Sequence, residues 1–170
     1  MLITNRLKIQ ALTLQQLKIG IRSLDELSNL LNLSLVPNLF EGIVQRTVSM
    51  KIQKMKIAPV ELHEWYTYWL IVIKREEVGV GLAGFKGSPD QNGSVEIGYG
   101  LVETYRGKRY MSEAVQALIG WAFLHSECNK VTATDVLTDN YASQKTLLHS
   151  GFNLDSQSPK GLNYSISKQK

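Results

Sequence analysis

Apolar residues recur at helical spacing most clearly in the stretch that begins at Met111. The apolar positions there are Met111, Ala114, Val115, Leu118, Ile119, Ala122 and Phe123. This i, i+3, i+4, i+7 pattern predicts an amphipathic helix with one buried face. Upstream, apolar side chains alternate with polar residues or glycine from Val95 to Tyr99, which predicts a strand. The centre of the chain should therefore run strand, short basic turn, helix.

The same reasoning predicts a second strand and helix after this unit. Residues 130–137 are rich in β-branched side chains and predict a strand that lies parallel to the strand before the helix. A helix is expected from Tyr141 to Ser150, ended by Gly151, and a last strand at 164–167. The second half of the chain is thus built around a β-α-β unit.

The first half opens with an alternating strand at residues 6–12, followed by Thr13 as the N-cap of a short helix. The sequence Ser-Leu-Asp-Glu at 23–26 has the form of a capping box and predicts a second short helix. A third helix is expected after Pro37, running toward Lys56 with a basic exposed face. This helical region carries little recognisable chemistry.

Three strands are predicted in the middle of the chain. Residues 70–73 are continuously apolar, 74–77 form a polar turn, and 78–85 form a glycine-rich strand. A loop at 88–93 leads into the strand described first, so these strands should form a meander. The aromatic residues at 65–69 either pack in the core or line a substrate pocket.

The length of 170 residues predicts one domain, spanning residues 1–170, with a sizeable core. A hydrophobic content of 44% is typical of a soluble globular protein, and no apolar run reaches membrane-spanning length. The N-terminal sequence lacks the features of a secretory signal, so the expected location is the cytoplasm, with no membrane partner. Cys128 is the only cysteine, which excludes an internal disulfide.

Charge adds a preference for anionic ligands. The formal net charge is +4, with local density at 51–56, at 106–109 and at 168–170. A dedicated nucleic-acid-binding domain usually shows a denser basic stripe with interleaved aromatic residues, so nucleic acid is not the expected partner. A polyanionic cofactor such as coenzyme A fits the cationic surface equally well. The three histidines are far apart and lack metal-ligand spacing, so no metal site is predicted.

The turn between the central strand and helix is the main candidate for binding chemistry. It runs from Tyr105 to Tyr110 with the sequence YRGKRY and places three cations within four residues. A helix N-terminus leaves backbone N–H groups unpaired and carries a partial positive charge, so it binds anions, phosphate above all. A solvated run of charge is the simpler alternative for this turn.

This turn resembles the acyl-CoA pyrophosphate loop of the GNAT N-acetyltransferases, R/Q-x-x-G-x-G/A. Arg106 matches the leading position, whereas Arg109 and Met111 stand where the family has Gly and then Gly or Ala. Glycine there allows positive φ and close backbone approach to phosphate, so Arg109 either strains the loop or adds a phosphate contact. The preceding Glu-Ile-Gly-Tyr at 96–99 resembles the strand of the ribosomal-protein alanine acetyltransferase branch.

A second motif extends the resemblance over nearly the whole chain. Asn140-x-x-Ser143, with Gly151-Phe152 downstream, resembles the family's N-x-x-S/A helix and the turn after it. The resemblance implies an α/β fold with a mixed, mostly antiparallel central sheet and flanking helices. It also implies a split in the sheet between the parallel fourth and fifth strands.

The resemblance further implies how acetyl-CoA, the expected cosubstrate, is held. The backbone of 99–101 should pair with pantetheine and stabilise the carbonyl oxygen, with Asn140 as a further hydrogen-bonding partner. Backbone N–H groups of 107–112 should hold the pyrophosphate. The residues assigned in this way to the cofactor are Tyr99, Gly100, Leu101, Arg106, Gly107, Lys108, Arg109, Tyr110, Met111, Ser112, Asn140 and Ser143.

By resemblance, a primary amine attacks the acetyl thioester directly, while the enzyme removes the ammonium proton and protonates the thiolate. Glu96 and Asp135 are the candidate general bases, and for each the alternative is a paired or exposed strand carboxylate. Many relatives protonate the thiolate with a tyrosine at the position of Leu147. Its absence here leaves Ser143, Tyr141 or a water molecule for that task.

Three functions follow as hypotheses. The first is an N-acetyltransferase whose amine acceptor is a protein N-terminus, a polyamine or another small amine. The second is a noncatalytic module of the same fold that binds or senses acyl-CoA. The third, ranked below both, is a nucleic-acid-binding domain that uses the basic turn and binds in a salt-sensitive way. Homodimers are common among such folds, although the sequence carries no signature of one.

Overall fold

The computed structural model describes residues 1–169, and Lys170, the last residue of the basic C-terminal stretch, lies outside them. The strands are β1 (Leu2–Ile3), β2 (Leu7–Ala11), β3 (Ser34–Leu35), β4 (Trp69–Ile73), β5 (Val78–Phe85), β6 (Ser94–Leu101), β7 (Lys130–Val136), β8 (Asn153–Ser158) and β9 (Gly161–Ser167). The helices are α1 (Leu14–Arg22), α2 (Leu24–Leu31), α3 (Ile43–Ile57), α4 (His63–Tyr66), α5 (Tyr110–Leu124) and α6 (Tyr141–His149). Within residues 1–169, no helix is both long enough and apolar enough to cross a bilayer.

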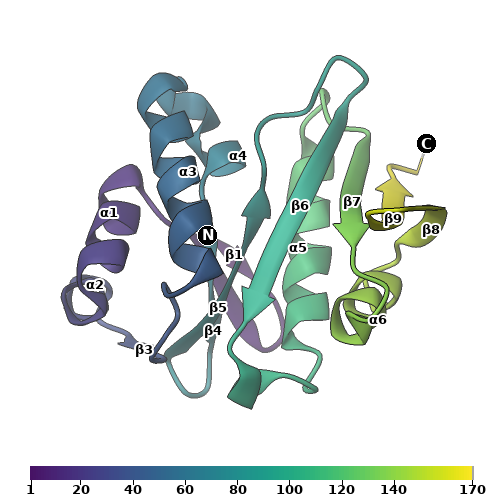
Figure 1. The fold of residues 1–170 in the computed structure, drawn as a ribbon. Coiled ribbons are helices and arrows are strands. Elements are labelled where there is room, and N and C mark those ends of the chain that lie inside the picture. Colours follow the sequence, from purple (N-terminus) through teal and green to yellow (C-terminus); the bar gives the residue numbers. More distant parts are fainter. Residues whose placement is uncertain (170) are drawn as a thin grey trace.

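The strands form one mixed sheet in the order β1-β2-β4-β5-β6-β7-β9-β8, with β3 paired to β5 (Figure 1). The β4-β5-β6 meander is antiparallel, as predicted. β6 and β7 are parallel, but they pair only between Ser94–Glu96 and Lys130–Thr132, and the two ribbons diverge beyond that point. The predicted fold class, a mostly antiparallel sheet split at a parallel pair and flanked by helices, is therefore confirmed.

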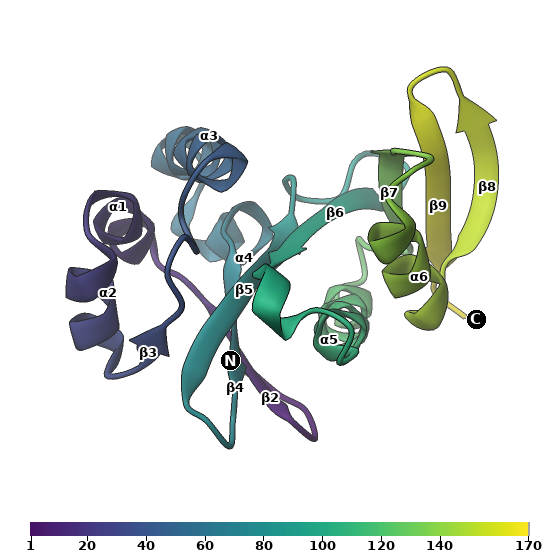
Figure 2. The same ribbon diagram turned by 60° about the horizontal axis from the view of Figure 1, so that its bottom comes forward.

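Helices cover both faces of the sheet. Figure 2 shows α3 on one side and α5 on the other, with α6 beside β7. Phe85 on β5 stacks on Trp121 of α5, and Ile97 lies opposite Phe85 on β6. Because side chains alternate along a strand, Ile97 and Tyr99 point to the α5 side. Glu96 and the next alternate residues on β6 point to the α3 side.

The predicted helix after the basic turn is α5, which begins one residue earlier than the apolar pattern. The buried members of that pattern are Met111, Ala114, Val115, Leu118, Ile119 and Ala122. Trp121, on the same helix, packs with Trp65 and Trp69 at centroid separations of 4.5 and 5.2 Å. For these two residues the core interpretation of the aromatic cluster is confirmed.

The first two helices begin at the residues that the sequence predicted. Thr13 caps α1 through a full capping box with Gln16, and α1 runs to Arg22, beyond the expected end at Leu17. Ser23 caps α2 by accepting from the Glu26 N–H, but the reciprocal half of the box is not formed. The Glu26 carboxylate instead pairs with Arg22, one turn back.

The expected basic exposed face of α3 requires one correction. Lys51 is only 8% exposed, and its ammonium group donates to the carbonyls of Phe85 and Tyr66. Burial, together with the nearby charges of Lys54 and Lys86, lowers the pKa of Lys51 to about 7. Helical periodicity did not reveal this, because the stem of a lysine can reach a polar partner from a core position.

Candidate active site at the split of the sheet

A pocket of about 630 Å³ opens where β6 and β7 diverge, between the N-terminus of α5 and the helix α6. It is lined by every residue that the sequence assigned to the cofactor except Lys108. The Lys108 ammonium instead lies 5.3 Å from the centre of the Tyr105 ring. Two motifs that lie about thirty residues apart in the sequence thus share one cavity.

The structure adds residues of α6 that the motifs did not indicate. Lys145 and His149 line the pocket and follow Tyr141, already a candidate for protonating the thiolate, at i+4 and i+8 along one face of the helix. This spacing was the available sequence signal for Lys145 and His149, both of which are exposed. Within residues 1–169, no aspartate or glutamate lines the pocket, so Arg106, Arg109 and Lys145 give it a positive character.

Beyond Glu96, the edge of β6 that faces the split is no longer paired with β7, although the Leu101 carbonyl accepts from Arg106 Nε at 3.2 Å. The β5–β6 ladder is bonded at its ends from Lys86 N to Glu96 O and from Val102 N to Val80 O. Backbone groups of successive residues along β6 point alternately toward β5 and away from it. Since Glu96 and Val102 bond to β5, the N–H and C=O of Ile97, Tyr99 and Leu101 point toward the split. The backbone groups of Gly100 point toward β5 instead, so the predicted backbone pairing with pantetheine applies to Tyr99 and Leu101.

Gly98 and Gly100 leave one face of β6 open. A Cβ atom added at either position would meet no atom within 4 Å. Both residues alternate with Tyr99, so this open face is the α3 side of the sheet. A molecule can therefore reach the split from this face, while the opposite face is covered by α5 (Figure 2).

The basic turn has two left-handed residues, Gly107 at φ +78° and Arg109 at φ +61°. Arg109 is the N-cap of α5 and makes no side-chain capping bond. The first intrahelical bond runs from Glu113 N to Arg109 O, so the N–H groups of 110–112 have no intrahelical acceptor. The turn therefore keeps the positive φ that the family reaches with glycine. Met111 turns into the core, where it is 6% exposed.

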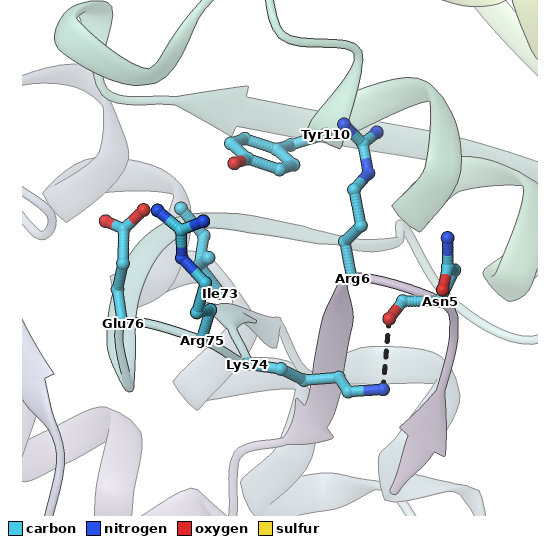
Figure 3. A pocket seen from close by; sticks show the side chains of 7 residues that line it. All are labelled: Asn5, Arg6, Ile73, Lys74, Arg75, Glu76 and Tyr110. Carbon is cyan, nitrogen blue, oxygen red and sulfur yellow. Dashed lines mark hydrogen bonds between the residues drawn. The ribbon is translucent and has the colours of Figure 1, made fainter.

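An ion pair fixes this turn to the beginning of the chain. The Glu113 carboxylate accepts from Thr4 Oγ1 at 2.6 Å, from Arg6 N at 2.8 Å and from Arg6 Nε at 2.7 Å. The Arg6 guanidinium also donates to the Lys108 carbonyl at 3.0 Å. It lies 4.7 Å from the centre of the Tyr110 ring, and Figure 3 shows these two side chains beside each other. We call this set of contacts the Arg6 clamp.

The Arg6 clamp also sets the protonation of its carboxylate. Burial alone would raise the pKa of Glu113, but the hydrogen bonds from Thr4 and Arg6 outweigh burial and lower it. A second pocket of about 470 Å³ lies beside the clamp, between Arg6 and Tyr110 on one side and the turn of Arg75 and Glu76 on the other (Figure 3). Tyr110 lines both pockets, so the clamp lies next to the larger one.

Tyr99 and Ser143, which belong to two different sequence motifs, are hydrogen-bonded across the split. The Tyr99 hydroxyl lies 2.9 Å from Ser143 Oγ. Burial raises the pKa of Tyr99 to about 12, so the phenol stays protonated at neutral pH. Asn140 caps α6 by accepting from Ser143 N at 3.1 Å, which leaves the Asn140 side-chain NH₂ as a donor toward the pocket.

Glu96 occupies the last paired position before β6 and β7 diverge. Its Oε1 accepts from Thr134 Oγ1 and from Lys86 Nζ, both at 2.6 Å, so the carboxylate bridges the two strands. The side chain is 24% exposed. Thr134 was missed by sequence reasoning, because its contact with Glu96 depends on the register between two distant strands.

Asp135, the other candidate base, lies in a bulge of β7. The pairing of β7 with β9 shifts between Ala133 and Val136, and Asp135 has φ +54°. Its N–H donates to Asn163 Oδ1, and the residue is exposed. Within residues 1–169, no group of three or more His, Cys, Asp or Glu side chains is arranged to hold a metal ion.

Comparison with known sequences finds a protein family that matches this chain. A profile described as "Acetyltransferase (GNAT) domain" matches residues 38–153. The "Uncharacterized N-acetyltransferase YjdG" of Bacillus subtilis (strain 168) is 43% identical over 90 residues, which are 53% of this chain and 53% of that protein. The aligned part thus spans about half the length of the curated relatives that it matches.

Solved structures share the fold over almost the whole chain. RimL, a ribosomal L7/L12 alpha-N-protein acetyltransferase in complex with coenzyme A, superposes with a TM-score of 0.67 at 17% identity, covering 98% of this chain and 96% of that one. The ribosomal-protein-S5-alanine acetyltransferase of Vibrio fischeri gives 0.62 at 18% identity, covering 98% and 95%. At these identities the likeness establishes the fold.

Proposed function

Because this chain belongs to the acetyltransferase (GNAT) domain family, we propose that it transfers the acetyl group of acetyl-CoA to a primary amine. The amine nitrogen attacks the thioester carbonyl, a C–N bond forms, the C–S bond breaks, and coenzyme A leaves as the thiol. The observation that carries this proposal is the pocket at the split, because it combines an unpaired strand edge, an uncapped helix N-terminus and a positive lining.

Each part of the pocket suits one part of acetyl-CoA. The N–H groups of 110–112, aided by Arg106 and Arg109, bind the pyrophosphate. The backbone of Tyr99 on the exposed edge of β6 pairs with the amides of the pantetheine arm and donates to the developing oxyanion. Asn140 binds the same arm through its NH₂ group. On α6, Lys145 supplies a further cation for the phosphates.

Glu96 is the proposed general base. It lies where the strands begin to diverge and on the open face of β6, so an amine that approaches the thioester passes close to it. Thr134 and Lys86 occupy Oε1, which leaves Oε2 to take the ammonium proton directly or through a water molecule. Asp135 is the second candidate, although it is exposed in its bulge. Ser143, oriented by Tyr99, donates to the departing sulfur.

The acceptor class is a protein N-terminus or a small amine. RimL and the Vibrio fischeri enzyme are named for acetylation of ribosomal proteins, which favours a protein N-terminus here. The alternative function is a noncatalytic module that binds acyl-CoA. It is favoured by Leu147, which is fully buried at the position where many relatives carry the thiolate-protonating tyrosine.

Release of free thiol from acetyl-CoA, measured with a panel of amines and N-terminal peptides, tests the proposal. We expect Glu96→Gln to lower kcat by at least about a hundredfold while acetyl-CoA affinity is kept, because general-base catalysis is typically worth 10²–10⁴-fold. Asp135→Asn should stay within about threefold of the parent, and a larger loss there with little effect of Glu96→Gln would move the role of base to Asp135. Tight acetyl-CoA binding without turnover on any acceptor would favour the noncatalytic module. Absence of acetyl-CoA binding would contradict both functions.

A further inference from the structure

Three lysine side chains meet at the end of β5, and one of them, Lys86, contacts the proposed base. Lys51 and Lys54 lie about one turn apart on α3, and both reach the end of β5. The Lys51 ammonium donates to the Phe85 carbonyl, and the Lys54 ammonium donates to the next carbonyl, that of Lys86, at 2.8 Å. Lys86 in turn pairs with Glu96 at 2.6 Å. We call Lys51, Lys54 and Lys86 the lysine patch.

The lysine patch lies on the side from which an acceptor arrives. Glu96, which Lys86 contacts, points to the same face of β6 as Gly98 and Gly100, where an added Cβ would meet no atom within 4 Å. The cofactor pocket lies at the other end of the divergence, along α5 and α6. An amine that approaches the thioester over this open face therefore arrives on the same side of the sheet as the patch and Glu96, whereas the cofactor pocket is lined by α5 and α6.

The charges on this path are unbalanced. With all three lysines protonated, they carry three positive charges against the single negative charge of Glu96. Burial lowers the pKa of Lys51 to about 7, so its charge is only partly present at neutral pH, whereas Lys54 is exposed and Lys86 has 60% of its side chain exposed. The path therefore stays net positive near pH 7, which repels a polycation and attracts an anion.

From this arrangement, and on the basis of the acetyltransferase function proposed above, we infer that the natural acceptor is an amine that carries carboxylate groups close to its amino group. A peptide N-terminus followed by Asp or Glu has this chemistry, and so does a free acidic amino acid. Polyamines are the wrong class. The nearby cations also favour the neutral form of the attacking amine, because they disfavour its ammonium form.

The test compares kcat/KM for three peptides that share an N-terminal serine and differ at the next two positions: Asp-Glu, Asn-Gln and Lys-Lys. Spermidine and free glutamate complete the panel. At low ionic strength we expect Asp-Glu to exceed Lys-Lys by at least about tenfold, and the ratio to shrink in 0.5 M salt because exposed charges are screened. The ratio between the Asp-Glu peptide and glutamate identifies the source of the carboxylates.

Two variants of α3 localise the effect. Lys54→Gln should lower the Asp-Glu to Lys-Lys ratio by roughly two- to fivefold, the size of one exposed ion pair, and Lys54→Arg should restore it. Lys56→Gln is the matched control. Lys56 is also exposed, but its ammonium contacts Gln53 on α3 rather than the sheet, so the ratio should stay unchanged.

The outcomes separate this inference from the function on which it rests. Turnover of the neutral Asn-Gln peptide together with equal or better use of Lys-Lys or spermidine would overturn the inference and leave acetyl transfer intact. An equal effect of Lys54→Gln and Lys56→Gln would also overturn it, since only net charge would then matter. No thiol release with any acceptor would refute the proposed function and the inference together.

Discussion

Arg109 combines a strained backbone with a side chain in the cofactor pocket, so its replacement by glycine should move stability and affinity in opposite directions. Its φ of +61° and ψ of 15° lie in the left-handed region, which costs an L-residue roughly 1–2 kcal/mol. Glycine removes that cost but gives the unfolded chain more freedom, worth about 0.4–1 kcal/mol. A net gain of about 0.5–1 kcal/mol corresponds to a Tm increase of about 1–4 °C for a chain of this size.

The same substitution removes a guanidinium group from the lining of the pocket. If Arg109 contacts the pyrophosphate, its loss should weaken acetyl-CoA binding by about tenfold, which corresponds to about 1.4 kcal/mol. Arg109→Ala separates the two effects, because alanine loses the charge but keeps the strained φ. Alanine should therefore show the weaker binding without the increase in Tm.

Thermal unfolding followed by circular dichroism, and calorimetric titration with acetyl-CoA, measure the two quantities on the same three proteins. Equal Tm values for the glycine and alanine variants would refute the strain argument. Unchanged affinity in both variants would show that Arg109 is not a phosphate contact. The two results are independent, so each half of the reasoning can fail alone.

Two further predictions concern charged groups outside the cofactor pocket. Glu113→Gln should weaken the Arg6 clamp, raise the KM for acetyl-CoA more than it lowers kcat, and cost about 1–2 kcal/mol of stability in urea unfolding at pH 7. Because folding lowers the pKa of Glu113, its carboxylate stabilises the folded state fully above the unfolded pKa near 4.5, and this stabilisation is lost as the pH falls through the folded pKa. A Glu113→Gln variant that loses stability in acid as steeply as the parent would contradict this. For Lys51, whose pKa falls from 10.5 to about 7 on folding, the unfolded chain binds more protons between these values, and stability should rise with pH from 7 to 10. Lys51→Met should remove this rise, and parallel pH profiles for the two proteins would show that the lysine is not responsible.

Local chemistry explains which parts of the site the sequence could predict. The turn of 105–110 and the cap at Asn140 are short motifs that can be recognised from consecutive residues, and the structure brings both to one pocket. Lys145 and His149 depend on the rotation of α6 about its axis, which weak amphipathicity does not fix. Whether they bind the cofactor remains a prediction, as it does for the motif residues.

Contacts between distant segments were beyond sequence reasoning. Thr134 reaches Glu96 only because β6 and β7 pair in one particular register. Lys51 is buried because α3 packs against the end of β5, although its position in the sequence is typical of a solvated charge. The strands β1, β3 and β8 were also missed, since β1 and β3 have two residues each and β8 is almost entirely exposed and lacks apolar alternation.

The Arg6 clamp has a consequence for how the cofactor loop is encoded. Its ion pair joins residues that are 107 positions apart in the chain, so the loop that reads as a six-residue motif acquires its conformation from a contact of very high sequence separation. Such a contact forms only after a long loop has closed, which places it late in the search for the native topology. A graft of YRGKRY onto another strand–helix unit would therefore transfer the charges of the loop but not the shape that positions them.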